Sequence, residues 1–257
     1  MATALITGAS SGIGMEMARI LARRGTDLVL AARREEILQN LKAELERQNG
    51  VQVRVLAVDL ADRAAVDGVF PSLRADGVAV DYLINNAGFG THGFFQETDL
   101  ERLQAMIDVN ITALTRLTRQ ALPGMLQRGR GRILNVASSI AFQPAALMSV
   151  YAATKAYVLH FSEALAVELK GTGIKVTALC PGPTASAFFT VADMDDAFLV
   201  KLFKPAAVRG VAEYGLAAMM AGRPVAIHGR FNRLMAFGVR FAPRRFVAWL
   251  AYRLMKG

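Results

Sequence analysis

The stretch Ala2–Arg24, ATALITGASSGIGMEMARILARR, decides how the rest of the chain is interpreted. It begins with a short apolar run, ATALIT, which is typical of a buried parallel strand. An amphipathic run from Met15 onwards predicts a helix, and Gly8, Gly12 and Gly14 lie between the two. A strand, a glycine-rich turn and a helix in this order predict the first unit of an α/β sheet.

The glycine-rich turn has the chemistry of a phosphate-binding loop. Glycines let a backbone approach a pyrophosphate closely, and the free N–H groups of the following helix face its negative charge. The spacing, Gly-x-x-x-Gly-x-Gly, differs from the Gly-x-Gly-x-x-Gly fingerprint, so an ordinary tight turn is the alternative. Ser10 and Ser11 can add hydroxyl donors. We expect a dinucleotide cofactor to bind here.

The run DLVLAA predicts a second strand that ends at Ala32, and Arg33 and Arg34 follow it at once. In dinucleotide-binding folds an acidic residue at this place holds the ribose 2′-hydroxyl, whereas an arginine accommodates a 2′-phosphate. Guanidinium groups pair with phosphate in a bidentate manner. The sequence therefore favours NADP(H) over NAD(H). For Arg34, capping the helix expected over residues 34–48 is the alternative.

Three further strands are expected, and each ends in polar residues. VQVRVLAVD ends at Asp59, followed by Leu60, and the carboxylate can hold an adenine amino group or cap the next helix. VDYLINNAG ends in Asn85–Gly88, whose amides can tie neighbouring strands while the small residues lie against a cofactor. RILNVAS places Ser138 at a carboxyl strand end, which is where open α/β sheets bind ligands.

A long helix is expected from about Asp99 to Gln127, and it carries Asn110 in an otherwise apolar run. Buried polar groups need partners, so Asn110 either satisfies backbone groups or holds a water near the chemistry. KVTALC and PVAI (224–227) complete six or seven strands. Strands that alternate with helices in this way predict a doubly wound parallel sheet in three layers, with helices on both faces.

Tyr151 and Lys155 lie four residues apart, and Ser138 precedes the tyrosine by thirteen positions. On a helix the two side chains share a face, with Cβ atoms ~5–6 Å apart. A neighbouring cation favours the phenolate and lowers the pKa of a tyrosine from its usual value of about 10. The pair therefore predicts a proton donor that also serves as a base. Taken alone, a surface helix that happens to carry both residues is the alternative.

These motifs, TGASSGIG at 7–14, NNAG at 85–88, Ser138, Tyr151-x-x-x-Lys155 and the Pro-Gly pair at 181–182, together resemble the short-chain dehydrogenase/reductase family. The resemblance covers roughly residues 3–190. It implies a Rossmann-type fold, NAD(P)-dependent interconversion of carbonyls and alcohols, and a homodimer or homotetramer. It also implies that Tyr151 is the general acid/base, Lys155 its activator and ribose ligand, Ser138 the hydroxyl that orients a substrate carbonyl, and Asn110 the anchor of a relay water.

The implied cofactor site draws on both the residue chemistry and the resemblance. Its expected members are Gly8, Ser10, Ser11, Gly12, Ile13, Gly14, Arg33, Arg34, Asp59, Leu60, Asn86, Ala87, Gly88, Tyr151, Lys155, Pro181, Gly182, Thr184 and Ser186. Ser138 and Tyr151 are expected to contact the substrate. The main hypothesis is an NADP(H)-dependent oxidoreductase for an apolar carbonyl or alcohol, and the alternative is a non-catalytic dinucleotide sensor or scaffold. No metal site is expected, because the three histidines lack ligand spacing.

A chain of 257 residues with 53% hydrophobic content suits one large domain, which we expect over residues 1–228. Residues 187–215 are rich in Phe and Met and are expected to form a flap over a pocket. The single cysteine, Cys180, excludes an internal disulfide and suits a reducing compartment. Because neither a signal peptide nor an uncharged apolar run of ~18 residues is visible, the cytoplasm is the expected location.

Residues 229–257 form a cationic, amphipathic extension. All 21 acidic residues lie at or before Glu213, whereas eight of the 30 basic residues follow it. Two short helices are expected on either side of Pro243. Three interpretations compete: a lid over an apolar pocket or a subunit contact, a peripheral contact with an anionic membrane, or a solvated helix. Basic groups interleaved with an apolar stripe argue against nucleic-acid binding.

Overall fold

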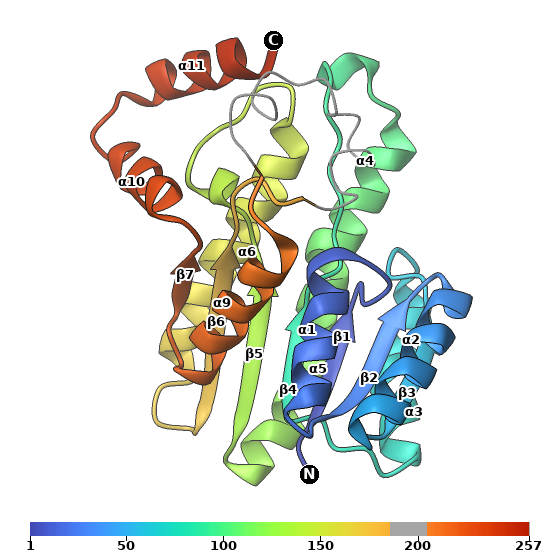
Figure 1. Ribbon diagram of the computed structural model, residues 1–257. Coiled ribbons are helices and arrows are strands. Elements are labelled where there is room, and N and C mark those ends of the chain that lie inside the picture. The colour runs from blue at the N-terminus through green and yellow to red at the C-terminus, as the bar shows by residue number, and fades with distance from the viewer. Residues whose placement is uncertain (186–204, 257) are drawn as a thin grey trace.

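The computed structural model describes residues 1–185 and 205–256. Within them, seven parallel strands form one sheet in the order β3-β2-β1-β4-β5-β6-β7, as Figure 1 shows. The strands are β1 (Thr3–Thr7), β2 (Asp27–Ala32), β3 (Val53–Ala57), β4 (Tyr82–Asn85), β5 (Gly131–Val136), β6 (Ile174–Cys180) and β7 (Val225–Ile227). The expected doubly wound parallel sheet is therefore confirmed.

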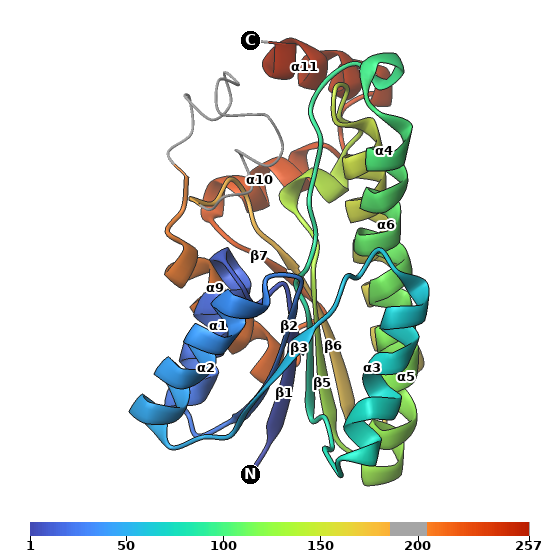
Figure 2. The same cartoon turned by 90° about the vertical axis from the view of Figure 1, so that its right-hand side faces the viewer.

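Helices cover both faces of this sheet. The α-helices are α1 (Gly12–Arg23), α2 (Glu35–Asn49), α3 (Arg63–Ala75), α4 (Leu100–Ile107), α5 (Leu114–Arg128), α6 (Ser149–Glu168), α9 (Val208–Met220), α10 (Arg230–Gly238) and α11 (Arg244–Lys256). In Figure 2, α1, α2 and α9 lie on one side of the sheet and α3, α5 and α6 on the other. This arrangement gives three layers, with apolar strands buried from both sides.

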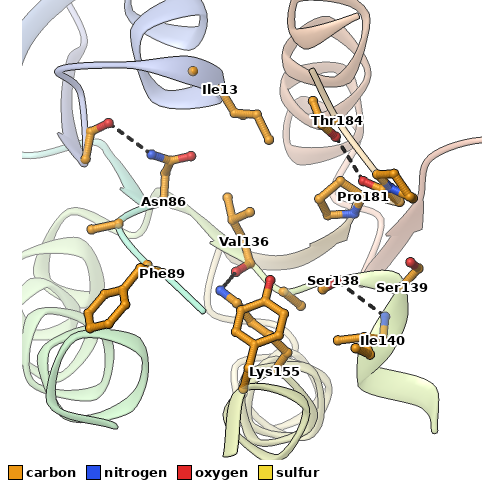
Figure 3. A pocket seen from close by; sticks show the side chains of 18 of the residues that line it. Ile13, Asn86, Phe89, Val136, Ser138, Ser139, Ile140, Lys155, Pro181 and Thr184 are labelled. Atoms are coloured by element: carbon orange, nitrogen blue, oxygen red, sulfur yellow. Dashed lines mark hydrogen bonds between the residues drawn. The ribbon is translucent and has the colours of Figure 1, made fainter. Parts of the chain in front are cut away.

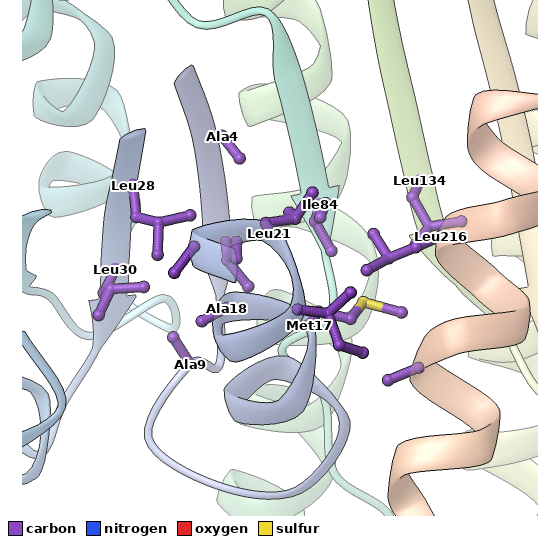
Figure 4. Close-up of a cluster of buried hydrophobic side chains, with 14 of the residues drawn as sticks. Ala4, Ala9, Met17, Ala18, Leu21, Leu28, Leu30, Ile84, Leu134 and Leu216 are labelled. Carbon is purple, nitrogen blue, oxygen red and sulfur yellow. The ribbon is translucent and has the colours of Figure 1, made fainter. Parts of the chain in front are cut away.

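The core between the sheet and the layer of α1 and α9 shows why the sequence folds in this way (Figure 4). Met17 and Leu21 of α1 and Leu216 of α9 are fully buried against Ile84 and Leu134 of the strands. Each such side chain contributes about 1.5–3 kcal/mol relative to an exposed position. The packing fixes the parallel strands so that their carboxyl ends, and the loops that follow them, lie at the same edge of the sheet.

The strand order reverses between β1 and β4, the two strands in the middle of the sheet. Ligands of open α/β sheets bind in the crevice outside such a point. Asn85 at the end of β4 donates its amide to Thr118 Oγ1 at 3.0 Å and to Asn135 Oδ1 of β5 at 2.9 Å. The bond to Asn135 ties neighbouring strands together, as expected from the adjacent asparagines, and the bond to Thr118 ties β4 to α5.

Two sequence expectations differ from the structure. The helix expected from Asp99 to Gln127 contains a wide π-helical turn, η2 (Asp108–Ala113), between α4 and α5. The flap expected over residues 187–215 is wrong for its last part, since α9 begins at Val208 and buries Val211 and Ala212 against the core. The remainder, residues 187–204, lies outside the described residues.

Candidate active site

A cavity of about 1230 Å³ lies at the carboxyl ends of the strands. Its walls come from the glycine-rich turn, the loops after β2 to β6, the first turns of α6, and the two C-terminal helices. Typical small-molecule sites measure about 300–1,000 Å³. The cavity therefore has room for a dinucleotide and a second molecule beside it.

Helix α6 brings the predicted catalytic pair to this cavity. Tyr151 and Lys155 lie in its first two turns and are both buried. Lys155 Nζ lies 5.8 Å from the centroid of the Tyr151 ring and donates to the carbonyl oxygen of Val136 at 2.8 Å (Figure 3). Tyr151 also shares a hydrogen bond with Ser138. The structure thus places Ser138, Tyr151 and Lys155 together, as their spacing predicts.

Burial dominates the electrostatics of this pair. It raises the pKa of Tyr151 well above its ordinary value, and the hydrogen bond with Ser138 offsets only part of the rise. Burial likewise lowers the pKa of Lys155 to about 8, although the neighbouring Cys180 acts in the opposite direction. The expected lowering of the pKa of Tyr151 is wrong for the protein groups alone, because burial of the phenol raises this pKa. Tyr151 is therefore a neutral phenol that holds a proton.

The two neighbouring serines after β5 have different surroundings. Ser138 precedes the short 3-10 turn η3 (Ser139–Phe142), and its Oγ accepts a hydrogen bond from the N–H of Ile140 at 3.3 Å. The backbone N–H of Ser139 instead donates to the carbonyl of Pro181. Ser138 is the serine that shares a hydrogen bond with Tyr151, which agrees with the thirteen-residue spacing.

Asn110 lies in the π-helical turn and is buried, but it does not border the cavity. Its Oδ1 accepts from the N–H of Phe89, while its Nδ2 donates to the Phe89 carbonyl and to Thr154 Oγ1 at 3.0 Å each. The side chain therefore satisfies backbone groups, which was the first of the two alternatives. By these bonds it holds the loop after β4 against α6. Its role in anchoring a water stays a prediction.

The glycine-rich turn is tightly packed against the loop after β4. Gly8 has a φ of +66°, and a Cβ there would lie 2.8 Å from Asn86 Nδ2. Asn86 donates this amide to the carbonyl oxygens of Thr7 and Gly8, as Figure 3 shows for one of the bonds. Gly14 packs behind the turn and does not border the cavity, whereas Gly8 and the residues at 10–13 do. Its role is to allow the close approach of α1.

The two arginines after β2 both border the cavity. Arg34 Nη2 donates to Ser10 Oγ at 3.0 Å and to the Ser10 carbonyl at 3.3 Å, so its guanidinium lies against the glycine-rich turn. Arg34 also occupies the N-cap position of α2, as the alternative expected, but its side chain makes no capping bond there. Two cationic groups thus stand beside the turn expected to hold phosphate.

The carboxylate of Asp59 accepts a hydrogen bond from the N–H of Ala61 and borders the cavity with Leu60. The capping role belongs to Asp62, whose Oδ1 accepts from the N–H groups of Ala64 and Ala65 at the start of α3. The alternative of Asp59 as the cap of this helix is therefore wrong, and the carboxylate stays near the cavity.

The segment after β6 closes the far wall. Pro181, Gly182 and Thr184 border the cavity, and Thr184 Oγ1 donates to the Gly182 carbonyl at 2.9 Å (Figure 3). Ser186 lies outside the described residues. In the described part of the chain, no three His, Cys, Asp or Glu side chains lie close enough to hold a metal ion.

Several contributors were missed by the sequence analysis. The carbonyl of Val136 holds the ammonium of Lys155, and a backbone carbonyl gives no signal in the sequence. The C-terminal helices border the cavity mostly through apolar side chains, among them Met235, Ala251 and Met255. Met255 packs in one buried cluster with Tyr151, and its carbonyl lies 3.2 Å from His92 Nε2. The alternation of apolar and basic residues in the extension was the available signal for such an inward face.

The lowered pKa of Lys155 predicts a specific pH dependence of stability. Between pH 8 and the ordinary pKa of 10.5, the unfolded chain binds a proton at Lys155 that the folded protein does not, so stability rises with pH. Below pH 8 the folded protein bears the full cost of the buried charge. Lys155→Met should therefore be more stable than the parent below pH 8, by up to about 3 kcal/mol, and should lose this advantage at higher pH.

Urea unfolding of the cofactor-free parent and variant on both sides of pH 8 measures this difference. Lys170→Met is the matched control, because Lys170 is exposed just beyond the end of α6. The same advantage of Lys155→Met at all pH values would contradict the assignment of the shifted pKa to Lys155.

The comparisons with known proteins agree with this geometry. A family model described as short chain dehydrogenase matches residues 2–196. A curated relative, the very-long-chain 3-oxoacyl-CoA reductase of Anas platyrhynchos, is 36% identical over 70% of this chain and 59% of its own length. The chain thus spans about three fifths of that relative.

Two solved structures match nearly the whole chain. A short-chain dehydrogenase from Sphingobium yanoikuyae in complex with NADPH is 38% identical, with a TM-score of 0.84 over 94% of each chain. A bulky-bulky ketone specific alcohol dehydrogenase from Comamonas testosteroni is 31% identical, with a TM-score of 0.80 over 96% of this chain and 99% of that one. With the strand order, the cavity and the family match in agreement, the chain belongs to the short-chain dehydrogenase family of NAD(P)-dependent oxidoreductases.

Proposed function

We propose that the protein uses NADP(H) to interconvert a carbonyl group, of a ketone or an aldehyde, and the corresponding alcohol on an apolar substrate. The observation that carries the proposal is the hydrogen-bonded pair of Ser138 and Tyr151 beside the buried ammonium of Lys155, at the edge of the cavity. A non-catalytic dinucleotide sensor has no need for such a group of side chains. The geometry therefore favours an enzyme over a sensor or scaffold.

The three side chains divide the work of proton transfer. In the reducing direction Tyr151 donates its phenolic proton to the carbonyl oxygen, and in the oxidising direction the phenolate takes a proton from the alcohol. Ser138 donates a hydrogen bond to the same oxygen as negative charge develops on it. The ammonium of Lys155 stabilises the phenolate that forms. A bound nicotinamide cofactor supplies or accepts the hydride at the substrate carbon.

The protein groups around the turn support binding of a dinucleotide with a 2′-phosphate. Ser11, Gly12 and Ile13 at the start of α1 line the cavity, where the free N–H groups of a helix can bind phosphate. The Ser11 hydroxyl makes no capping bond to the helix. Arg34 reaches the same wall from the end of β2. NADPH in the solved Sphingobium structure supports the same preference.

Arg34→Ala is expected to raise the Kd for NADPH about 10–100-fold, because a charge-assisted contact to the 2′-phosphate is lost. The Kd for NADH, which lacks this phosphate, should change by less than about twofold by the same reasoning. Titration of both cofactors by fluorescence measures the two constants. Arg24→Ala, at an exposed position at the opposite end of α1, is the matched control. An equal loss for both cofactors would mean that Arg34 only supports the turn through Ser10.

The substrate part of the cavity supports an apolar, sizeable substrate. Phe89, Ile140, Met148, Leu254 and Met255 line the cavity around the catalytic group. Side chains of this kind recognise hydrocarbon surface rather than polar groups. The Comamonas enzyme, which is named for bulky ketones, and the duck relative, which is named for very-long-chain 3-oxoacyl-CoA, support the same class.

Assembly and location complete the proposal. The family resemblance favours a homodimer or a homotetramer. The chain has a single cysteine and so can form no internal disulfide, which suits the reducing cytoplasm. Residues 229–257 are the part of the chain available for contact with a membrane.

The test of the proposed function is the consumption of NADPH with a panel of ketones and aldehydes of increasing apolar size, run in both directions. NADP and NAD are compared side by side in each assay. Turnover of the larger apolar members with NADPH is the expected result. Tight NADPH binding without turnover of any carbonyl compound or alcohol would contradict the proposal and favour the sensor.

A further inference from the structure

Helices α10 and α11 present an outward face that is rich in exposed aromatic side chains. Leu234, Phe237 and Phe241 follow one another at three- and four-residue spacing, and all are more than half exposed. Phe241 is 75% exposed, although its ring packs edge-on against that of Phe237 with centroids 5.1 Å apart. Single exposed apolar residues are normal on protein surfaces, whereas a group of this kind marks a contact surface.

Helix α11 continues the pattern. Phe246 and Trp249 stack with ring centroids 5.9 Å apart, and both are about half exposed. The opposite side of α11 buries Val247, Ala251 and Met255 against the rest of the molecule. Helix α11 therefore has two distinct faces: an inner face that borders the cavity and an outer, aromatic face that is exposed. Figure 1 places both helices at the end of the molecule beyond the carboxyl ends of the strands.

The charged residues of the two helices and of the segment between them, residues 230–256, have one sign. Seven basic residues lie exposed on or between the two helices: Arg230, Arg233, Arg240, Arg244, Arg245, Arg253 and Lys256. The sequence contains no acidic residue after Glu213. The Arg253 guanidinium lies 5.6 Å from the Trp249 ring centroid, and the Lys256 ammonium 5.5 Å from that of Tyr252. In such cation–π pairs the cationic group stays close to the aromatic ring, so both belong to the same surface.

Exposed aromatics ringed by cations fit the interface of an anionic bilayer. Aromatic side chains enter the boundary between headgroups and acyl chains, and arginines meet the lipid phosphates above it. A second copy of the chain is a poor occupant, because two such faces would bring like charges together with no acid in either extension. Among residues 1–185 and 205–256, no helix has the length and hydropathy to span a bilayer. Contact would therefore be peripheral.

We propose that the outer face of α10 and α11, formed by Leu234, Phe237, Phe241, Phe246 and Trp249 with the surrounding cations, docks on anionic lipid membranes. Membrane docking is a further property beside the proposed reductase activity, and it does not depend on that activity. The inner face borders the cavity while the outer face lies on the lipid.

Trp249 is the only tryptophan in the chain, so its fluorescence reports directly on this face. The full-length protein is mixed with vesicles of phosphatidylcholine alone or of phosphatidylcholine with phosphatidylglycerol. The expected result is a shift of the emission to shorter wavelength, with quenching by brominated acyl chains, only for the anionic vesicles. The affinity should fall as salt is raised, because the Debye length shrinks.

Three variants separate the contributions. The double variant Phe237→Ser/Phe241→Ser should weaken vesicle binding at least about tenfold, because two exposed phenyl rings that would enter the lipid are removed. Arg244→Gln and Arg245→Gln should each weaken it about fivefold. The matched control is Leu126→Ser, at an exposed leucine near the end of α5, which lies by the amino ends of the strands; it should leave binding unchanged. Retained NADPH binding shows that each variant is folded.

An unchanged Trp249 emission with anionic vesicles would overturn the proposal, and so would equal binding to neutral vesicles. A blue shift that grows with protein concentration in the absence of lipid, together with a larger mass in analytical ultracentrifugation, would also overturn it and assign the face to a second copy. Loss of binding in the Leu126→Ser control would overturn the proposal, because the contact would then lie elsewhere.

Discussion

Tyr151→Phe is expected to lower kcat by about 10²–10⁴-fold while the Kd for NADPH stays within about twofold of the parent value. The phenol of Tyr151 shares a hydrogen bond with Ser138 and lies beside the Lys155 ammonium. Phenylalanine keeps the ring and its packing but has no proton to donate. Steady-state turnover of the best carbonyl substrate, together with a cofactor titration, measures both quantities.

A second tyrosine of the same helix provides the control. Tyr157 of α6 is 38% exposed, does not border the cavity, and shares a 2.9 Å hydrogen bond with Thr115 Oγ1. Tyr157→Phe removes the same hydroxyl from the same helix and should leave kcat within about twofold. Comparable turnover by Tyr151→Phe and the parent would rule out the assigned acid/base role.

Gly14→Ala is expected to weaken NADPH binding by more than about tenfold and to destabilise the fold by about 1–3 kcal/mol, as overpacking does. A Cβ at this position would lie 2.6 Å from the Gly8 carbonyl oxygen and 2.5 Å from Asn86 Nδ2. Relief requires α1 to move away from the turn, which displaces the N–H groups that face the cavity. Thermal unfolding should show a lower Tm, by roughly 2–4 °C for each kcal/mol.

Gly210→Ala is the matched control for this change. Gly14 and Gly210 are each the third residue of their helices, α1 and α9, but a Cβ at Gly210 would meet nothing within 4 Å. Alanine there should leave cofactor binding unchanged and stabilise the helix by up to about 1 kcal/mol. Equal behaviour of the two variants would show that the close approach at Gly14 is unimportant.

The sequence predicted the fold because its local signals agree with one another. Apolar runs, glycines and helical periodicity all follow the βα order, and strand ends must carry the loops of a parallel sheet to one edge. The sequence alone therefore predicts that Ser138, Tyr151 and Lys155 lie together. Their spacing in the sequence translates directly into neighbouring positions on η3 and α6.

What the sequence could not predict depends on burial and on backbone partners. The pKa of Tyr151 rises because the ring is desolvated, and no residue pattern reports that. Asn110 pairs with the backbone of Phe89 across a π-helical turn, whose extra residue leaves no local signature. Whether Asp59 or Asp62 caps the helix depends on the residue at which α3 begins, and a sequence pattern does not fix helix boundaries to within one or two residues. The inner face of α11 was predictable only as one of several alternatives.

The uneven distribution of charge makes the molecule a strong electric dipole. Residues up to Glu213 are almost neutral as a group, whereas the eight cations that follow include seven on or between the two helices above the cavity. In the field of a negatively charged molecule or surface, the resulting torque turns the end with α10 and α11 toward the negative charge before contact. A phosphate-bearing cofactor is itself such a body, so its association rate should be faster at low ionic strength. The same asymmetry would orient the protein as it approaches an anionic surface, with the cavity end first.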